Sequence, residues 1–383
     1  MGGYPPNWIG LIYGSESGEE TCIRMIGKVS FSLLWVWTWL LLVLPSSAQT
    51  PYLSEARVLL KRVPLVDGHN DTPWQYRKRV NSDLSRIDLR SNTARLWPPM
   101  QTDIPRLRQG GVGAQFWSVY LPTDQPNTVA AFHNQVRLAQ RMIALYPEFE
   151  LATTADEIEK LHGEGKIASL MGVEGGHALG GSLAELRWLY AQGVRYMTLT
   201  HSRSNDLADS SGGPNWHGGL SEKGRSVVKE MNRLGMLIDS SHTSDSTARQ
   251  VLQLSTKPVV FTHSNARGLT DEDRNVPDDI LKQLKENDGV IMLSFVPSFV
   301  HEGDNRATIE HVADHFDYVK NLIGVRHIGV GADFDGIDKG PGGLEDVSRY
   351  PFLFAELMSR GWSEAELEMV AGGNLLRVMR ANE

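Results

Sequence analysis

Pro64-Leu65-Val66-Asp67-Gly68-His69-Asn70-Asp71 is the segment that best separates two alternative α/β folds for this chain. A doubly wound open sheet usually follows its first strand with a glycine fingerprint that binds a dinucleotide. Here the apolar run ends in His69 and Asp71 instead. In a closed barrel, functional polar side chains gather where the strands end. The segment therefore favours a barrel, with the open sheet as the alternative.

The rest of the chain repeats the pattern of a short apolar run followed by a longer amphipathic segment, without a linker or a low-complexity stretch. The eight strand candidates are Pro64–Gly68, Gly113–Tyr120, Ile167–Val173, Tyr196–Thr200, Met236–Ser240, Val259–Thr262, Val290–Phe295 and Ile328–Ala332. The helical candidates between them are Val129–Leu145, Leu183–Ala191, Lys223–Leu234, Ser246–Leu254, Asp278–Leu284 and Ile309–Ile323. Eight β-then-α units predict a (β/α)8 TIM barrel. Two extra C-terminal helices, around Phe352–Met358 and Ala365–Met379, would complete its outer layer.

The composition suits one such barrel and excludes some classes of function. With 383 residues, of which 41% are hydrophobic and 22% charged, the chain can bury one large core. The net charge of −8 gives no basic surplus to neutralise phosphates, so we expect no nucleic-acid partner. The one cysteine, Cys22, precedes the main hydrophobic run. Any metal must therefore be held by His, Asp and Glu, and the folded body has no internal disulfide.

A hydrophobic segment near the N-terminus predicts entry into the secretory pathway. Residues 31–44 are almost wholly apolar, but this run is shorter than the membrane span of about 20 residues. A basic Lys28 before it and small residues up to Ala48 give residues 25–48 the layout of a signal peptide. Residues 1–24 then form an N-terminal extension, explained by a start codon placed too early or by a short cytosolic tail. We expect cleavage after Ala48, which leaves 49–383 as a secreted barrel domain.

The alternative is an uncleaved signal anchor, in which residues 31–44 attach the protein to a membrane. A buried core helix explains this run poorly, because its tryptophans and leucines would cover every face of the helix. The last seven residues, 377–383, read RVMRANE and carry no hydrophobic tail, so we expect no GPI anchor.

Charged or imidazole side chains follow six of the eight predicted strands. They are His69 and Asp71 after the first strand, then Glu174, His201, His242, His263 and Asp333 after the third, fourth, fifth, sixth and eighth. Singly, each has an ordinary explanation as a hydrogen-bonded loop residue or an ion pair. Together they are hard to explain by packing, because such groups are costly beside a barrel interior unless they pair or bind metal. Five other histidines lie in helical patterns or start a strand, and we assign them to structure or solvent: His133, His162, His311, His315 and His327.

Three histidines, an aspartate and a glutamate form a ligand set suited to Zn²⁺ and acceptable to Mn²⁺, Co²⁺ or Fe²⁺. The set is His69, Asp71, Glu174, His242 and His263. Five ligands exceed one tetrahedral catalytic site. They fit two ions roughly 3.5–4 Å apart that share one bridging carboxylate. We therefore expect two divalent metal ions per chain, with Zn²⁺ the first choice.

Seven blocks of this sequence resemble the membrane (renal) dipeptidase family, the M19 metallopeptidases, from Val63 to about Ala381. The blocks are Val66–Asp71, Gly172–Gly175, Leu199–Ser202, Met236–His242, Pro258–Ser264, Arg274–Asp279 and Gly331–Gly336. Blocks in this order and at family-like spacing are far more specific than any one motif. The resemblance implies a TIM barrel that hydrolyses the peptide bond of L-aminoacyl-L-amino acids, with dipeptides as its binding partners.

The resemblance also implies how the metal ligands are shared. It places one ion on His69 and Asp71, the second on His242 and His263, and Glu174 between them. Two cations lower the pKa of a water that bridges them to about 7 or below, which supplies hydroxide at neutral pH.

Three further residues receive roles from the resemblance. It implies that His201 and Arg274 hold the substrate or the reaction intermediate and that Asp333 transfers the proton, with Asp335 as the alternative acid. An arginine can clamp a free α-carboxylate with two parallel hydrogen bonds. A carboxylic acid can protonate the departing amine, which leaves poorly as an anion.

Some features of the family do not transfer, and some alternatives stay open. Mammalian relatives carry disulfides and a GPI signal, and Arg203 stands where those relatives place a cysteine. Another binuclear-metal hydrolase of amides, lactams or lactones on the same scaffold is the second enzyme hypothesis, although no lysine follows a strand to serve as a carboxylated bridge. An inactive binding homologue would be expected to have lost a ligand. A homodimer, and a role on cysteinyl-glycine units of glutathione-derived metabolites, also stay open.

Overall fold

The computed structural model describes residues 52–303 and 306–383, which lie within the compact unit Ala48–Glu383. The predicted extension 1–24 and the predicted signal segment 25–48 lie outside the described residues. Among the helices that are described, none is long and apolar enough to cross a membrane. The predictions of a signal peptide and of a membrane anchor therefore stay predictions.

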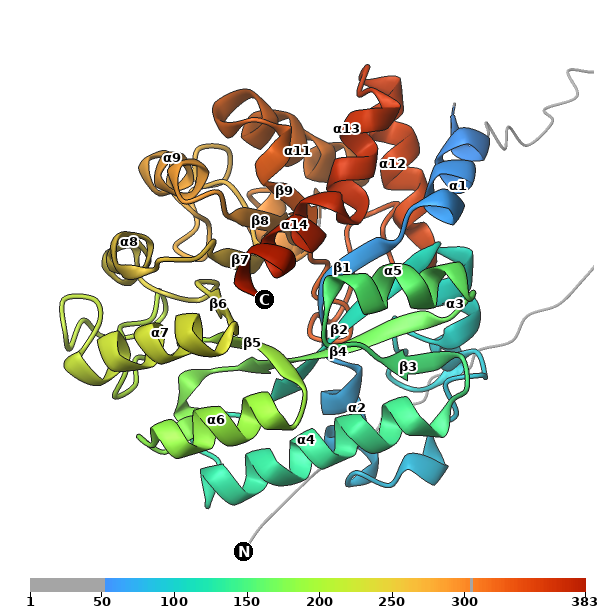
Figure 1. Cartoon of the computed structure of the whole chain (residues 1–383). Coiled ribbons are helices and arrows are strands. Elements are labelled where there is room, and N and C mark those ends of the chain that lie inside the picture. Colours follow the sequence, from blue (N-terminus) through green and yellow to red (C-terminus); the bar gives the residue numbers. More distant parts are fainter. Residues whose placement is uncertain (1–51, 304–305) are drawn as a thin grey trace, which may run out of the picture. The chain divides into compact units, whose positions relative to one another are not determined.

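Eight parallel strands close into a barrel, which confirms the predicted fold (Figure 1). Around the ring they are β1 (Leu65–Asn70), β2 (Val112–Tyr120), β4 (Ile167–Glu174), β5 (Val194–Thr198), β6 (Leu237–Asp239), β7 (Val260–Ser264), β8 (Val290–Leu293) and β9 (Ile328–Val330). β9 pairs with β1, and the pairing of β2 with β4 continues the ring from Ala114 opposite Ala168 to Tyr120 opposite Glu174. These strands are almost entirely buried, as expected for a parallel sheet with helices on its outer face.

One short strand was not predicted. β3 (Phe149–Leu151) pairs with the first residues of β4, Ile167 to Ser169, and β5 pairs further along, from Met171 onward. β3 therefore extends the sheet beside the ring without joining it. With three residues, of which only Phe149 is buried, it lacks the long apolar run that marks the other strands.

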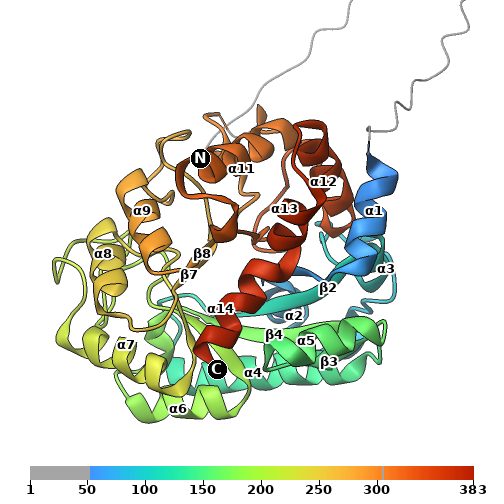
Figure 2. The same cartoon turned by 45° about the horizontal axis from the view of Figure 1, so that its top comes forward.

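Helices surround the barrel, most of them on its outer face (Figures 1 and 2). They are α1 (Leu53–Arg62), α2 (Thr72–Val80), α3 (Ile104–Gln109), α4 (Thr128–Leu145), α5 (Ala155–Gly163), α6 (Leu183–Ala191), α7 (Glu222–Leu234), α8 (Asp245–Leu254), α9 (Asp278–Glu286), α10 (Pro297–Val300), α11 (Ile309–Ile323), α12 (Tyr350–Ser359), α13 (Glu364–Glu368) and α14 (Asn374–Asn382). Serine residues cap the N-termini of several helices. The side chains of Ser221 at α7 and Ser244 at α8 accept hydrogen bonds from backbone N–H groups of the first turn. The predicted helical segments all lie within observed helices, except that 365–379 is divided by a π-helical turn, Met369–Gly373.

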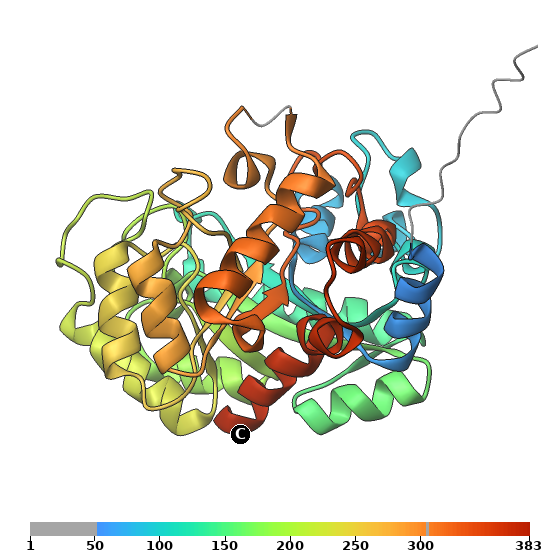
Figure 3. The same ribbon diagram turned by 90° about the horizontal axis from the view of Figure 1, so that it is seen from above.

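The last helix corrects the prediction that the C-terminal segment completes the outer layer. α14 crosses the N-terminal end of the barrel, and its apolar residues pack with inward-facing strand residues such as Val66 and Met292 (Figure 1). The Asn382 amide donates to the carbonyl of Pro258, just before β7. The helix therefore closes the end of the barrel opposite to the strand C-termini, and the view in Figure 3 shows it beneath the outer helices. A site at the other end can stay polar and open.

Candidate active site

The predicted functional side chains meet at the C-terminal ends of the strands. His69 lies within β1, Glu174 ends β4, and His263 lies within β7. Three others lie three residues beyond a strand: His201 after β5, His242 after β6 and Asp333 after β9. The closed ring brings these strand ends together, so that three groups of candidate metal ligands form around them.

Glu174 occupies the centre of this cluster, and its two oxygens face different neighbours. Oε1 lies 3.0 Å from His242 Nε2 and 3.4 Å from His263 Nε2. Oε2 lies 3.6 Å from His69 Nε2 and accepts a hydrogen bond from the Ser118 hydroxyl at 3.2 Å. A carboxylate with each oxygen turned to a separate set of ligands has the arrangement of a bridge between two cations.

The second side of the cluster consists of His69, Asp71 and Asp333. His69 Nε2 lies 3.3 Å from Asp71 Oδ2 and 4.0 Å from Asp333 Oδ1. Gly336 packs against both carboxylates, because a Cβ atom there would come within 2.4 Å of Asp71 Oδ2 and 2.5 Å of Asp333 Oδ1. A larger residue at position 336 would push these acids apart.

The hydrogen bonding of the cluster suits metal ions. His69 Nε2 and Asp71 Oδ1 are buried and have no hydrogen-bond partner among the described residues. A buried polar atom without a partner is costly, and a cation would satisfy both of these atoms. The donor set of imidazoles and carboxylates is the one that Zn²⁺ and similar ions prefer. The described residues therefore fit a metal centre at this position.

The electrostatics point the same way. Burial lowers the pKa values of His242 and His263 well below the usual value, so that both imidazoles are neutral and can offer a lone pair. Burial also acts against a charge on His69, but Tyr196, Glu174 and Asp71 raise its pKa well above the usual value. The carboxylates of Glu174 and Asp71, which attract a proton to His69, would equally attract a metal cation.

Three residues of this region hold a backbone conformation that side chains rarely adopt. The φ angles of His242, Asp333 and Asp335 are +65°, +68° and +64°. Such left-handed conformations cost free energy in residues other than glycine and persist where the surrounding structure enforces them. Here they turn the chain sharply after β6 and β9, where His242 and Asp333 enter the cluster.

The two aspartates of Asp333-Phe334-Asp335 have different surroundings. Asp335 accepts hydrogen bonds from the Thr72 hydroxyl at 2.8 Å and the Gln101 backbone N–H at 2.7 Å, away from the ligand cluster. Asp333 lines the pocket above the cluster, and burial, together with the charges of Asp71 and Glu174, raises its pKa well above the usual value. Asp333 is thus placed to hold a proton beside a bound molecule, and Asp335 is occupied in the structure.

The pocket above the cluster has a volume of about 230 Å³. Its lining residues are Asp71, Trp74, Tyr120, Glu174, His201, His242, Asp333 and Gly336. The Tyr120 ring lies between Trp74 and His201, with ring centroids 5.2 Å and 4.7 Å away. His201 Nε2 lies 3.7 Å from Glu174 Oε1, so His201 reaches the ligand cluster from the pocket wall.

Arg274 lies beside this cluster and outside its ligand groups. Its guanidinium donates to His242 Nδ1 at 3.0 Å and to the Ser264 hydroxyl at 3.1 Å, and it lies over the Phe299 ring at 5.3 Å. Burial lowers its pKa to about 10, which leaves the side chain charged at neutral pH. The structure therefore brings together all eight residues that the sequence singled out.

The groups that hold the histidines of the candidate metal centre were not predicted from the sequence. The Tyr196 hydroxyl lies 2.9 Å from His69 Nδ1, inside the barrel. The Thr262 hydroxyl lies 2.9 Å from His263 Nδ1 and donates to Asp239, a fully buried carboxylate, at 2.7 Å. Partners of this kind fix the orientation of metal-binding imidazoles. One signal was available: the glycine Gly172 lies within β4, where a Cβ atom would come 2.0 Å from the Tyr196 ring.

The histidines assigned to structure lie elsewhere in the described residues. None of His133, His162, His311, His315 and His327 belongs to a group of candidate metal ligands. His315, for example, is buried and bonds the carbonyl of Val300.

Known proteins resemble this chain along most of its length. The family model described as "Membrane dipeptidase (Peptidase family M19)" matches residues 53–383. Dipeptidase 3 of Mus musculus is 46% identical over 336 residues, which cover 86% of this chain but only 66% of that protein. Dipeptidase aclJ of Aspergillus oryzae is 45% identical over 334 residues, which cover 84% of this chain and 78% of that protein.

A solved structure extends the comparison to three dimensions. A metallo peptidase from Rhodobacter sphaeroides, liganded with a phosphinate mimic of the dipeptide L-Ala-D-Ala, is 27% identical, with a TM-score of 0.74. The match covers 84% of this chain and 99% of that chain.

Proposed function

Since the chain belongs to the membrane dipeptidase family, peptidase family M19, we propose that it hydrolyses the peptide bond of dipeptides with the help of two divalent cations, Zn²⁺ being the expected ion. The observation that carries the proposal is the position of Glu174, whose Oε1 faces His242 and His263 while Oε2 faces His69. His69 and Asp71 would hold one ion, His242 and His263 the other. Cations held there would lower the pKa of a water and polarise the peptide carbonyl.

The residues around the pocket would divide the remaining work. Arg274 would bind the free carboxylate of the substrate, which favours peptides that end one residue after the cleaved bond. His201 would stabilise the negative oxygen that develops on the attacked carbonyl, as a hydrogen-bond donor from the pocket wall. Asp333 would give its proton to the departing amine. Burial raises the pKa of Asp333, which supports this role, since the proton must be present at a pH at which an ordinary aspartate is ionised.

The decisive experiment measures metal and activity together. Purified protein should contain close to two divalent ions per chain by elemental analysis, and it should hydrolyse L-Ala-L-Ala. Removal of the ions by a chelator should abolish hydrolysis, and restored Zn²⁺ should return it. A metal-free preparation with full activity would rule out the proposal.

The substrate class that we propose is L-aminoacyl-L-amino acids. The Rhodobacter sphaeroides peptidase was solved with a mimic of L-Ala-D-Ala, so the stereochemistry of the second residue needs its own test. The test compares kcat/KM for three substrates. L-Ala-L-Ala reports general dipeptide turnover, L-Ala-D-Ala reports a preference for a D-residue, and a Cys-Gly S-conjugate reports the trimming of cysteinyl-glycine units. A marked preference for either of the last two would overturn the L,L assignment.

We also propose that the protein enters the secretory pathway. The support is the sequence of residues 25–48, which lie outside the described structure. N-terminal sequencing of the mature protein should find a start near Gln49. Retention of residues 31–44 would instead indicate a membrane-anchored form.

A further inference from the structure

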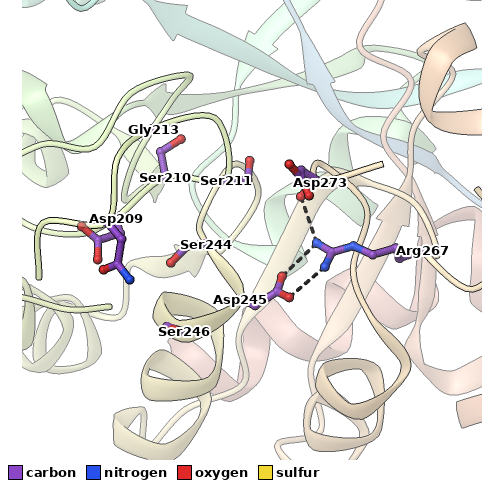
Figure 4. A pocket seen from close by; sticks show the side chains of 10 residues that line it. Asp209, Ser210, Ser211, Gly213, Ser244, Asp245, Ser246, Arg267 and Asp273 are labelled. Carbon is purple, nitrogen blue, oxygen red and sulfur yellow. Dashed lines mark hydrogen bonds and ion pairs between the residues drawn. The ribbon is translucent and has the colours of Figure 1, made fainter. Parts of the chain in front are cut away.

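A second polar pocket, of about 270 Å³, lies at the same end of the barrel as the ligand cluster (Figure 4). Its wall contains an ion pair between Arg267, which follows β7, and Asp245, in the first turn of α8. The pair is bidentate: Arg267 Nη1 donates to Asp245 Oδ2 at 2.8 Å, and Nη2 donates to Oδ1 at 2.9 Å. Both side chains are largely covered, with 21% and 33% exposed, and paired arginine geometry of this kind is specific.

The remaining donors of Arg267 hold the loop that carries Arg274. Arg267 Nε donates to the backbone carbonyls of Glu272 at 3.2 Å and Asn275 at 3.0 Å. Nη2 donates to the carbonyl of Asp273 at 3.0 Å, a contact drawn in Figure 4. The carbonyls of the residues immediately before and after Arg274 are thus both bonded to one guanidinium.

Among the described residues this loop contains no strand or helix, and besides the Arg267 contacts the Asn275 amide holds it by donating to the carbonyls of Thr270 and Phe299. Between β7 and α9 the described chain has only one isolated bridge, Ala266 with Val276. Asp245 lies three residues after His242, and the Nε of Arg274 donates a hydrogen bond to that histidine. The Arg267–Asp245 pair therefore connects the segment that carries a metal-ligand candidate to the loop that carries the carboxylate-binding candidate.

We infer that Arg267, oriented by Asp245, is a positioning residue that holds Arg274 at the distance needed to bind the substrate carboxylate. The inference rests on the proposed role of Arg274. The donors of Arg267 are taken up by Asp245 and by three carbonyls of the loop, so it acts through Arg274 and through no contact of its own with substrate. Lysine could not replace it, because an ammonium lacks the fork that reaches the carboxylate and three carbonyls together.

The first test replaces Arg267 by methionine, which keeps a long apolar stem without the guanidinium. For L-Ala-L-Ala, Arg267→Met should raise KM by roughly 5-fold, since small displacements of a binding group weaken its contribution, with kcat and metal content unchanged. For the C-terminal amide of the same dipeptide, which offers Arg274 no carboxylate, KM should not change. Arg267→Lys should behave like Arg267→Met. Asp245→Asn should give the same pattern, and it decides the question if Arg267→Met does not fold.

Arg249→Met is the matched control. Arg249 is also an arginine beside Asp245, 4.0 Å away, but its guanidinium donates to Asp279 on α9 and to no carbonyl of the Arg274 loop. Its replacement should leave KM unchanged for both substrates.

The second test repeats Arg267→Met in an Arg274→Ala background. If Arg267 acts through Arg274, the second substitution should add no further rise in KM. An equal rise in both backgrounds, or no rise in folded Arg267→Met and Asp245→Asn, would overturn the inference while the role of Arg274 stands. If Arg274→Ala alone leaves KM unchanged, the proposed role of Arg274 fails and this inference fails with it, whereas metal-dependent hydrolysis is unaffected.

Discussion

The two ends of the barrel are built from the same eight strands, but they use polar groups in opposite ways. At the N-terminal end, α14 inserts Leu376 and Val378 among apolar side chains, and the Asn374 amide donates to the carbonyls of Val325 and Ile328. At the C-terminal end, the buried atoms His69 Nε2 and Asp71 Oδ1 have no hydrogen-bond partner within residues 52–303 and 306–383. Two buried atoms of α14, Arg377 Nε and Asn382 Oδ1, also lack a partner among the described residues, but the other nitrogens of these side chains donate to backbone carbonyls. The unpartnered atoms at the C-terminal end belong instead to a cluster of candidate metal ligands.

Because of this difference, we expect substitutions at one end of the barrel to change mainly stability and substitutions at the other end to change mainly activity. Side chains that close the N-terminal end should contribute to the free energy of unfolding and leave catalysis alone, and the side chains of the ligand cluster at the C-terminal end should do the reverse. Substitutions at the two ends can test the separation directly.

The largest effect is expected at Glu174. Even partners that orient metal ligands cost roughly 10–100-fold when they are lost, so Glu174→Ala, which removes the carboxylate shared by both ligand sets, should reduce kcat/KM by more than roughly 100-fold. Metal content per chain should fall as well. Elemental analysis and dipeptide kinetics measure the two losses, with Glu222→Ala, a fully exposed glutamate on α7, as the control. Unchanged metal content would contradict the bridging role.

Asp333 should come next. Asp333→Asn keeps the shape of the side chain but cannot donate a carboxyl proton, so kcat should fall by roughly 10²-fold while metal content stays the same. Asp335→Asn is the matched control two residues away, because its oxygens already accept hydrogen bonds from Thr72 and Gln101. Asp335→Asn should lower the melting temperature and leave kcat nearly unchanged. A fall in kcat for Asp335→Asn without one for Asp333→Asn would assign the proton donor to Asp335.

Arg274 should show a smaller effect, confined to binding. A hydrogen bond to a charged group contributes about 1.5–3 kcal/mol, so Arg274→Ala should raise KM for L-Ala-L-Ala by roughly 10-fold or more and change kcat little. The preference for a free over an amidated C-terminus should largely disappear. A fall in kcat with an unchanged KM would instead indicate that Arg274 acts in the chemical step and not in substrate binding.

The sequence predicts the C-terminal end of the barrel better than the N-terminal end. Polar residues after apolar runs mark His69, Glu174 and His263, because so many of them at strand ends are together hard to explain by packing. The closure by α14 was not predicted, since the spacing of apolar residues shows that a helix has a buried face but not which surface covers it.

The supporting groups of the site escaped prediction for a related reason. Tyr196 and Thr262 lie within apolar strands, where a tyrosine or threonine is ordinary. Only the folded barrel brings the Tyr196 hydroxyl to His69, 127 positions away in the sequence. Strand ends can be located from local patterns, whereas partners across the barrel depend on the register of strands that are distant in sequence.

The smallest effect on activity is expected at Leu376, where the comparison of the two ends can fail most clearly. Leu376 is 4% exposed and packs among inward-facing strand residues at the N-terminal end. Leu376→Ala should lower the free energy of unfolding by about 2–5 kcal/mol, because it removes buried apolar surface and leaves a cavity. The folded fraction should keep the kcat, KM and metal content of the unsubstituted protein, since the ligand cluster lies at the opposite strand ends. Leu145→Ala is the matched control: Leu145 ends α4 with 48% of its surface exposed, and its replacement should change stability by no more than about 0.5 kcal/mol. Denaturant unfolding and dipeptide kinetics on the same samples measure both quantities. A loss of metal or a lower kcat in folded Leu376→Ala would mean that the two ends are coupled through the strands, so that packing beneath the barrel also sets the positions of the ligands above it.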